Sequence, residues 1–228
     1  MSLILSIDSS IPSGSVALLD SDRILSQKVF PEDLPSSKGL LEYIDQLLTD
    51  NRLELKEVDG FCITTGPGSF TGLRVGLSLL KGLALGTGKP FIGIDTLEAL
   101  ASQVAPCSSL ICPLLDARKK EVYTAFFKYK GNNLVRQSAD IATTPEKLAD
   151  QILESTIFVG QGIEVYGDYL KKRLGSYFVH EFKTWKDSTA ARAGVLAEKR
   201  FKAEKKLDLD MLQINYLRKS DAEIQSKQ

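Results

Sequence analysis

The chain has 228 residues, 43% of them hydrophobic and 25% charged, and its 29 basic side chains are balanced by 29 acidic ones. This balance argues against a large basic surface that binds nucleic acid electrostatically, although a local basic patch remains compatible with it. With a single histidine, His180, the chain cannot form a multi-histidine metal site, and we expect no metal. Cys62, Cys107 and Cys112 form no C-x-x-C pair, which indicates reduced thiols in a cytoplasmic protein. No apolar run reaches membrane-spanning length, so no membrane association is expected.

The first half of the chain predicts a mixed α/β domain. An apolar strand at residues 3–8 ends in the carboxylate of Asp8, and turn-forming residues follow it. The next expected elements are strands at 15–19 and 24–30, a helix at 38–50, a strand at 61–64, a glycine-rich helix running towards Pro90, a strand at 91–94 and a helix at 96–104. Three strands in meander order followed by alternating helices and strands predict a mixed sheet covered by helices.

The second half begins after Pro106 and also opens with an apolar strand that leads to an aspartate, Asp116. Its expected elements are strands at 110–115 and 121–129, a helix at 145–154, a strand at 157–160, a helix at 164–174, a short strand at 177–181 and a long helix at 189–203. Two α/β halves therefore follow one another along the chain.

The stretch from Thr64 to Pro90 is the most unusual one. It turns through Gly66-Pro67-Gly68 and continues as a helix that carries Gly72, Gly76 and Gly82, although each glycine inside a helix costs about 1 kcal/mol relative to alanine. Glycines four residues apart leave a flat strip on a helix, and another backbone can approach that strip closely. The strip predicts either a docked partner or packing inside the domain, where the glycines only relieve crowding.

Two nucleotide-binding motifs fail on spacing in this stretch. A dinucleotide fingerprint needs two residues between its second and third glycines, whereas three separate Gly68 from Gly72. A P-loop needs four residues between its glycines, whereas five separate Gly82 from Gly88, and a proline follows Lys89.

A nucleotide could still be held at the ends of the two aspartate-terminated strands. Asp8 with Ser9 and Ser10 combines a strand-end carboxylate with turn amides, which suits a phosphate and its cation. The alternative is a carboxylate that caps local N–H groups. Asp116, the carboxylate at the end of the second such strand, could form either a structural pair or a polar clamp with Arg118. The basic clusters Lys119-Lys120 and Lys171-Lys172-Arg173 are solvated faces or contacts to an RNA backbone.

Motifs along nearly the whole chain resemble the TsaB (YeaZ) family. They are Ile7-Asp8, Gly66-Pro67-Gly68-Ser69-Phe70-Thr71-Gly72-Leu73-Arg74, Ile94-Asp95-Thr96-Leu97, Leu115-Asp116-Ala117-Arg118 with Glu121-Val122-Tyr123, and Tyr216-Leu217-Arg218. The resemblance implies the actin/Hsp70/sugar-kinase (ASKHA) fold, an α/β fold of two related domains with mixed β-sheets. We expect these domains at residues 1–105 and 106–207, with the segment 208–228 packing back on the first.

The resemblance also implies a function. Proteins similar to TsaB are non-catalytic subunits in the synthesis of N6-threonylcarbamoyladenosine (t6A) in tRNA. The implied partners are TsaD, the related catalytic protein, and the ATPase TsaE, with a homodimer in the absence of TsaD and tRNA reached through the complex. The chain itself requires no cofactor, and ATP or ADP is expected only at a partner interface. The alternatives are an ATPase or phosphotransferase of the ASKHA superfamily that uses Asp8 and, more remotely, a peptidase.

The expected site is the glycine-bearing helix and the turn before it, which would form the partner or dimer interface. The expected contact residues are Gly68, Phe70, Thr71, Gly72, Arg74, Val75, Gly76, Ser78, Leu79 and Gly82. The candidate nucleotide-binding residues are Asp8, Ser9, Ser10 and Asp116. No catalytic residue is expected.

Overall fold

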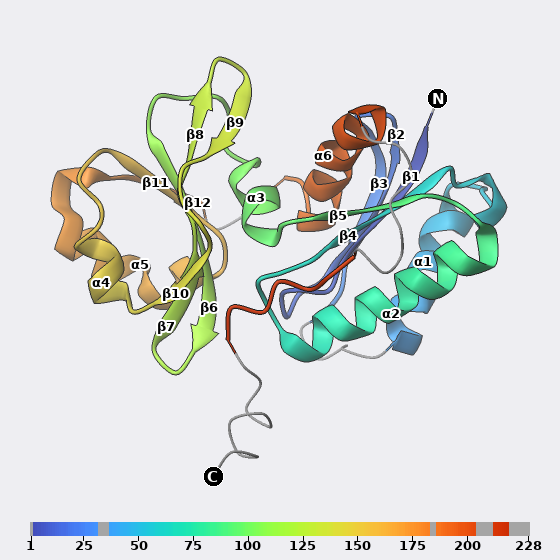
Figure 1. Cartoon of the computed structure of the whole chain (residues 1–228), viewed down its shortest axis with the longest axis horizontal. Helices are drawn as coiled ribbons and strands as arrows, with labels where there is room; N and C mark the ends of the chain where they lie inside the picture. Colours follow the sequence, from blue (N-terminus) through green and yellow to red (C-terminus); the bar gives the residue numbers. More distant parts are fainter. Residues whose placement is uncertain (1, 32–36, 183–185, 204–211, 219–228) are drawn as a thin grey trace, which may run out of the picture. The chain divides into compact units, whose positions relative to one another are not determined.

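The computed structural model describes residues 2–31, 37–182, 186–203 and 212–218 (Figure 1). Contacts divide the chain into unit 1, Met1–Ala99 with Asp187–Asn215, and unit 2, Leu100–Lys186 with Tyr216–Gln228. The helix expected at 189–203 thus lies in unit 1, although the sequence assigned it to the second domain. Within the expected C-terminal segment, residues 212–215 belong to unit 1 and 216–218 to unit 2, and the remainder lies outside the described residues. Among the described helices, none combines the length and the apolar character needed to cross a membrane.

Unit 1 is built on a five-stranded sheet with the order β3-β2-β1-β4-β5. The strands are β1 (Leu3–Asp8), β2 (Ser15–Asp20), β3 (Arg23–Val29), β4 (Gly60–Thr64) and β5 (Phe91–Ile94). The first three form an antiparallel meander, and β4 and β5 run parallel to β1. Because side chains alternate along a strand, Leu5 and Ile7 of β1 face one side of the sheet, and Ile4, Ser6 and Asp8 face the other.

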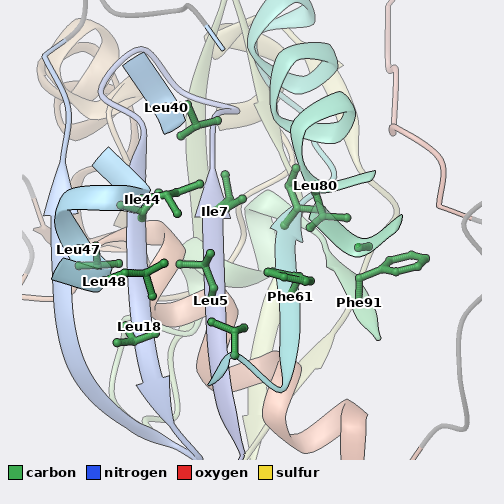
Figure 2. Packing of buried hydrophobic residues seen from close by; sticks show 14 of the residues in the cluster. Leu5, Ile7, Leu18, Leu40, Ile44, Leu47, Leu48, Phe61, Leu80 and Phe91 are labelled. Carbon is green, nitrogen blue, oxygen red and sulfur yellow. The ribbon is translucent and has the colours of Figure 1, made fainter. Parts of the chain in front are cut away.

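Helices cover both faces of this sheet. On one face, α1 (Ser37–Asp50) and α2 (Phe70–Thr87) lie side by side. Figure 2 shows leucines and Ile44 of α1 and Leu80 of α2 packed on Leu5, Leu18 and Phe61. The opposite face carries α6 (Thr189–Ala203), whose alanines pack closely on the sheet. The short helices η1 (Leu55–Glu57) and α3 (Thr96–Ala101) precede β4 and follow β5.

Unit 2 repeats this topology with the strand order β10-β7-β6-β11-β12, in which β8 pairs with β6 and β9. Its strands are β6 (Leu110–Arg118), β7 (Glu121–Thr124), β8 (Phe127–Lys130), β9 (Asn133–Arg136), β10 (Ile141–Thr143), β11 (Thr156–Val159) and β12 (Phe178–Phe182). Its helices are α4 (Pro145–Ala149), α5 (Gly162–Leu174) and η2 (Gly175–Tyr177). As in unit 1, antiparallel strands lie on one side of the opening strand and two parallel strands on the other. The prediction of an α/β protein with two related domains and mixed sheets is confirmed.

Some element boundaries differ from the prediction. The single strand expected at 121–129 is two strands, β7 and β8, because the chain between them bonds elsewhere: the N–H of Phe126 donates to Ser138 Oγ at 2.9 Å, and its carbonyl accepts from Gln137 at 2.7 Å. Strands β9 and β10 were not predicted. The helices expected to reach residues 104 and 154 end at Ala101 and Ala149.

Candidate functional site

Helix α2 is defined at both ends by its own sequence. Ser69 is the N-cap, and its Oγ accepts a hydrogen bond from the N–H of Gly72 at 3.2 Å. At the other end, Gly88 takes up the left-handed conformation with φ 67°, and its N–H donates to the carbonyl of Ala84 at 2.8 Å. The helix buries Leu73, Leu80 and Ala84 against the sheet, together with Gly72 and Gly76.

The glycines at the start of α2 face the chain's own β1–β2 turn. A Cβ atom on Gly68 would overlap the carbonyl of Ser10, and one on Gly72 would overlap the carbonyl of Ser9. A Cβ atom on Gly76 would overlap Ser9 Oγ. Packing inside the domain therefore requires these three glycines. Gly68 and Gly72 thus accommodate the backbone carbonyls of Ser10 and Ser9, and Gly76 accommodates the side chain of Ser9, so the close neighbour of all three glycines lies in the same chain.

The other expected contact residues lie on or beside the exposed side of α2. Thr71, Arg74, Ser78 and Gly82 are exposed, whereas Phe70, Val75 and Leu79 are half-buried. In the part of the chain that the structure describes, no atom lies within 4 Å of the position of a Cβ atom on Gly82 or on Gly86. Leu85, which was not among the expected contact residues, leaves 71% of its surface exposed. We call the exposed residues Thr71, Arg74, Ser78, Gly82, Leu85 and Gly86 the outer face of α2.

The N-terminal part of this outer face carries the positive charge of Arg74, which packs on a neighbouring aromatic ring. The guanidinium carbon of Arg74 lies 3.8 Å from the centre of the Phe70 ring, one helical turn earlier, which is a close cation–π contact.

Helical spacing could have revealed Leu85, because it follows Ser78 by seven residues and so shares its side of the helix.

Asp8 lies at the end of β1, fully buried, and its Oδ1 accepts three hydrogen bonds from the chain. The donors are the N–H of Ser10 at 2.9 Å, the hydroxyl of Ser10 at 2.6 Å and the hydroxyl of Thr64 at 2.6 Å. Thr64 was not singled out in the sequence, although the parallel register of β1 and β4 pairs Ile7 with Ile63 and so brings the next residues together.

Burial raises the pKa of the Asp8 carboxyl above its ordinary value, and hydrogen bonds from Ser10, Thr64 and Thr189 offset part of this rise. The Thr189 hydroxyl favours the charged form of the Asp8 carboxyl. Oδ1 is bonded to its own chain, whereas Oδ2 is buried and has no donor in hydrogen-bonding geometry among the described residues. The observed arrangement corresponds to the capping alternative.

Asp116 lies on β6 in unit 2 and takes part in a local polar network. Its Oδ1 accepts from the N–H of Arg118 at 2.9 Å and from the hydroxyl of Tyr166 at 3.4 Å. The pKa of Tyr166 is raised, first by burial and then by the charge of Asp116. Arg218 donates to the carbonyl of Ala117 at 3.1 Å and forms an ion pair with Glu121 at 3.1 Å. His180 belongs to β12, and its side chain lies outside the described part of the structure.

Comparisons with known proteins agree with the fold and the motifs. The family model described as TsaD, tRNA N6-adenosine threonylcarbamoyltransferase, matches residues 21–226. The tRNA threonylcarbamoyladenosine biosynthesis protein TsaB of Haemophilus influenzae is 30% identical over 190 residues, which cover 75% of this chain and 77% of that protein. The chain belongs to the TsaB (YeaZ) family, which is related to TsaD.

Solved structures extend the agreement to the fold. YeaZ from Pseudomonas aeruginosa, a TsaB-family structure, superposes with a TM-score of 0.78 at 25% identity, covering 95% of this chain and 100% of that one. A ROK hexokinase from Thermus thermophilus reaches a TM-score of 0.53 at 10% identity, covering 89% of this chain and 100% of that one. The second likeness concerns the fold alone, and together they identify the ASKHA fold expected for a TsaB-family protein.

Proposed function

We propose that this chain is a non-catalytic subunit in the synthesis of t6A in tRNA, and that it docks on TsaD through the outer face of α2. Family membership supports the role in t6A synthesis, since relatives carry that biosynthesis in their names. The observation that carries the docking surface is the composition of the outer face: exposed small residues run beside a leucine that leaves 71% of its surface exposed.

The geometry of this face favours a second helix as the occupant. Ser78, Gly82 and Gly86 follow one another at four-residue spacing, so they form a strip of small residues that a facing helix can approach closely. Leu85 and the half-buried Leu79 supply apolar surface beside this strip. Burying an exposed leucine side chain stabilises a complex by roughly 1.5–3 kcal/mol.

TsaD suits this position because the two proteins are related, as the match to the TsaD family model indicates. A related fold presents a helix at the equivalent place, so the two chains meet in a near-twofold arrangement. In the absence of TsaD, a second copy of this chain occupies the same face. TsaE joins the heterodimer, and tRNA and any ATP or ADP are held by the complex. The chain acts by stabilising the active arrangement of TsaD, which is a coupling of binding equilibria.

Replacing Gly82 by leucine tests this proposal. The variant will fold, because no atom of the described residues lies within 4 Å of the Cβ position, but the new side chain will keep a facing helix from approaching the strip of small residues. We expect its affinity for TsaD, measured by calorimetry, to fall by about tenfold or more, and t6A formation in a reconstituted reaction to fall with it. Lys172→Leu, an exposed substitution on α5, is the matched control and will leave both unchanged. Wild-type affinity and full t6A formation by Gly82→Leu would show that the face is not the docking site.

A further inference from the structure

The β1–β2 turn supports only the N-terminal half of α2. The N–H of Ser69 donates to the carbonyl of Ser10 at 2.7 Å, immediately before the helix begins. Further along, Gly72 and Gly76 lie against Ser9 so closely that neither has room for a Cβ atom. By contrast, none of the described residues has an atom within 4 Å of the Cβ positions of Gly82 and Gly86. The placement of the first two turns of the helix therefore depends on where this turn lies.

Asp8 holds the turn in that place. Its Oδ1 bonds both the N–H and the hydroxyl of Ser10, which fixes the residue whose carbonyl receives Ser69. The same oxygen bonds Thr64 at 2.6 Å, which ties the turn to the end of β4. The whole group is buried, so water does not compete for these bonds, and the turn has few alternative positions.

We propose that Asp8 is a positioning residue for the docking face: it fixes the Ser9–Ser10 turn, and the turn fixes the first half of α2. This half carries Thr71 and the Phe70–Arg74 cation–π pair. The inference rests on the proposed function, since it assigns Asp8 a part in docking on TsaD. The proposal also gives a role to the Asp8 carboxylate, which lies at the end of β1 and bonds to the hydroxyl groups of Ser10 and Thr64.

The structure makes this proposal specific, because Asp8 is expected to influence one half of a helix and not the other. Amide hydrogen exchange on the isolated chain measures this directly. In Asp8→Ala we expect exchange to accelerate by about tenfold or more in peptides covering residues 69–76 relative to peptides covering 80–87. Asp8→Asn retains an oxygen for the Ser10 and Thr64 donors, and its amide can donate to Thr189, so it will restore the wild-type pattern.

A matched control separates positioning from general loss of stability. Ile92 is buried on the α6 side of the sheet, away from the turn, so Ile92→Ala will accelerate exchange without favouring residues 69–76. If Asp8→Ala does not fold, Ser10→Ala removes only one hydroxyl and will give the same pattern with a smaller amplitude. Uniform acceleration in the Asp8 or Ser10 variants, as in Ile92→Ala, would overturn the proposal.

Affinity for TsaD provides the second readout, measured at equal concentrations of folded protein. Asp8→Ala, or Ser10→Ala in its place, will weaken binding by about threefold to tenfold, whereas Asp8→Asn and Ile92→Ala will bind as the wild type does. If these variants bind TsaD as tightly as the wild type, the positioning role is wrong although docking stands. If the wild-type chain itself does not bind TsaD, the proposed function fails, and the exchange pattern alone then decides whether Asp8 positions α2.

Discussion

The N–H of Ser69 donates to the carbonyl of Ser10 at 2.7 Å, so the residue that caps α2 is bonded to the turn that follows β1. Through this bond a turn and a helix far apart in the sequence share one packed contact. Residues on the two sides of α2 are consequently constrained by different contacts. The inner residues must fit against the β1–β2 turn, and the outer residues must fit the partner that docks on the helix.

Two alanine substitutions on α2 will change stability in opposite directions. Gly76→Ala places a methyl group on Ser9 Oγ and within 3.1 Å of Ile63 Cδ1, and we expect this overpacking to lower the free energy of unfolding by about 1–3 kcal/mol. The methyl group of Gly82→Ala meets no atom of residues 2–31, 37–182, 186–203 and 212–218 within 4 Å, and the variant will raise the free energy of unfolding by about 0.5–1 kcal/mol because alanine favours the helix. Urea denaturation measures both, and equal stability of Gly76→Ala and wild type would contradict the packing.

The buried Asp8 makes stability depend on pH. Its folded-state pKa is raised above the ordinary value of 3.8, so the folded chain holds this proton more tightly than the unfolded chain does. Stability from this group is therefore present at the lowest pH and is lost as pH rises from about 4 through the folded-state pKa. Asp8→Asn lacks this loss. We expect the stability of Asp8→Asn relative to wild type to increase with pH across this window, and a constant difference from pH 4 to 8 would contradict the direction of the shift.

Thiol labelling of the native protein will distinguish the three cysteines. Burial raises the pKa of Cys62 to about 12 and that of Cys112 to about 12, so neither forms a thiolate near neutral pH. Cys107 is only half-buried. With iodoacetamide at neutral pH, mass spectrometry of peptides will find Cys107 modified first, and Cys62 and Cys112 modified only after denaturation. Early modification of Cys62 would show that the sheet of unit 1 opens under native conditions.

The β6–β7 hairpin contains a backbone strain that glycine relieves. Arg118, Lys119 and Lys120 have φ values of 58°, 52° and 63°, a region that costs a non-glycine residue roughly 1 kcal/mol or more. Lys120→Gly will raise the free energy of unfolding by about 0.5–1 kcal/mol. The same change at Lys172, inside helix α5, will lower it by about 1 kcal/mol. A loss of stability in both variants would contradict the assigned turn conformation.

Local signals in the sequence were enough to predict most of the sheet-forming segments. The apolar runs of β1, β4, β5 and β11 are short and bounded by turn residues, so each is recognisable without its neighbours. The run at 121–129 misled the prediction because Phe126 continues its apolar character, although its backbone bonds to Gln137 and Ser138. Which residues pair across a sheet is decided by partners that the local sequence does not contain.

At the site, too, local sequence predicted a feature but not the residues that contact it. Gly72 and Gly76 correctly predicted a close neighbour, but nothing in helical spacing states whether that neighbour belongs to the same chain. The sequence left Ser9 and Ser10 open to a nucleotide or to local capping, and it left the glycines open to a partner or to packing inside the domain, whereas the structure brings these residues together in one contact. Thr189 near Asp8 could not be found, because an alanine-rich helix such as α6 carries no sign of which sheet it covers.

The position of α6 has a consequence for the order in which the protein matures on the ribosome. Its residues, Thr189–Ala203, are synthesised after every strand of both sheets, yet they cover the face of the unit 1 sheet formed by Ile4, Leu19 and Ile92. That face stays uncovered while unit 2, whose described strands all lie between Leu110 and Phe182, can already complete its own core. The half of the protein that is translated first is therefore the last to close, and a nascent chain stalled before residue 189 presents an apolar sheet to chaperones.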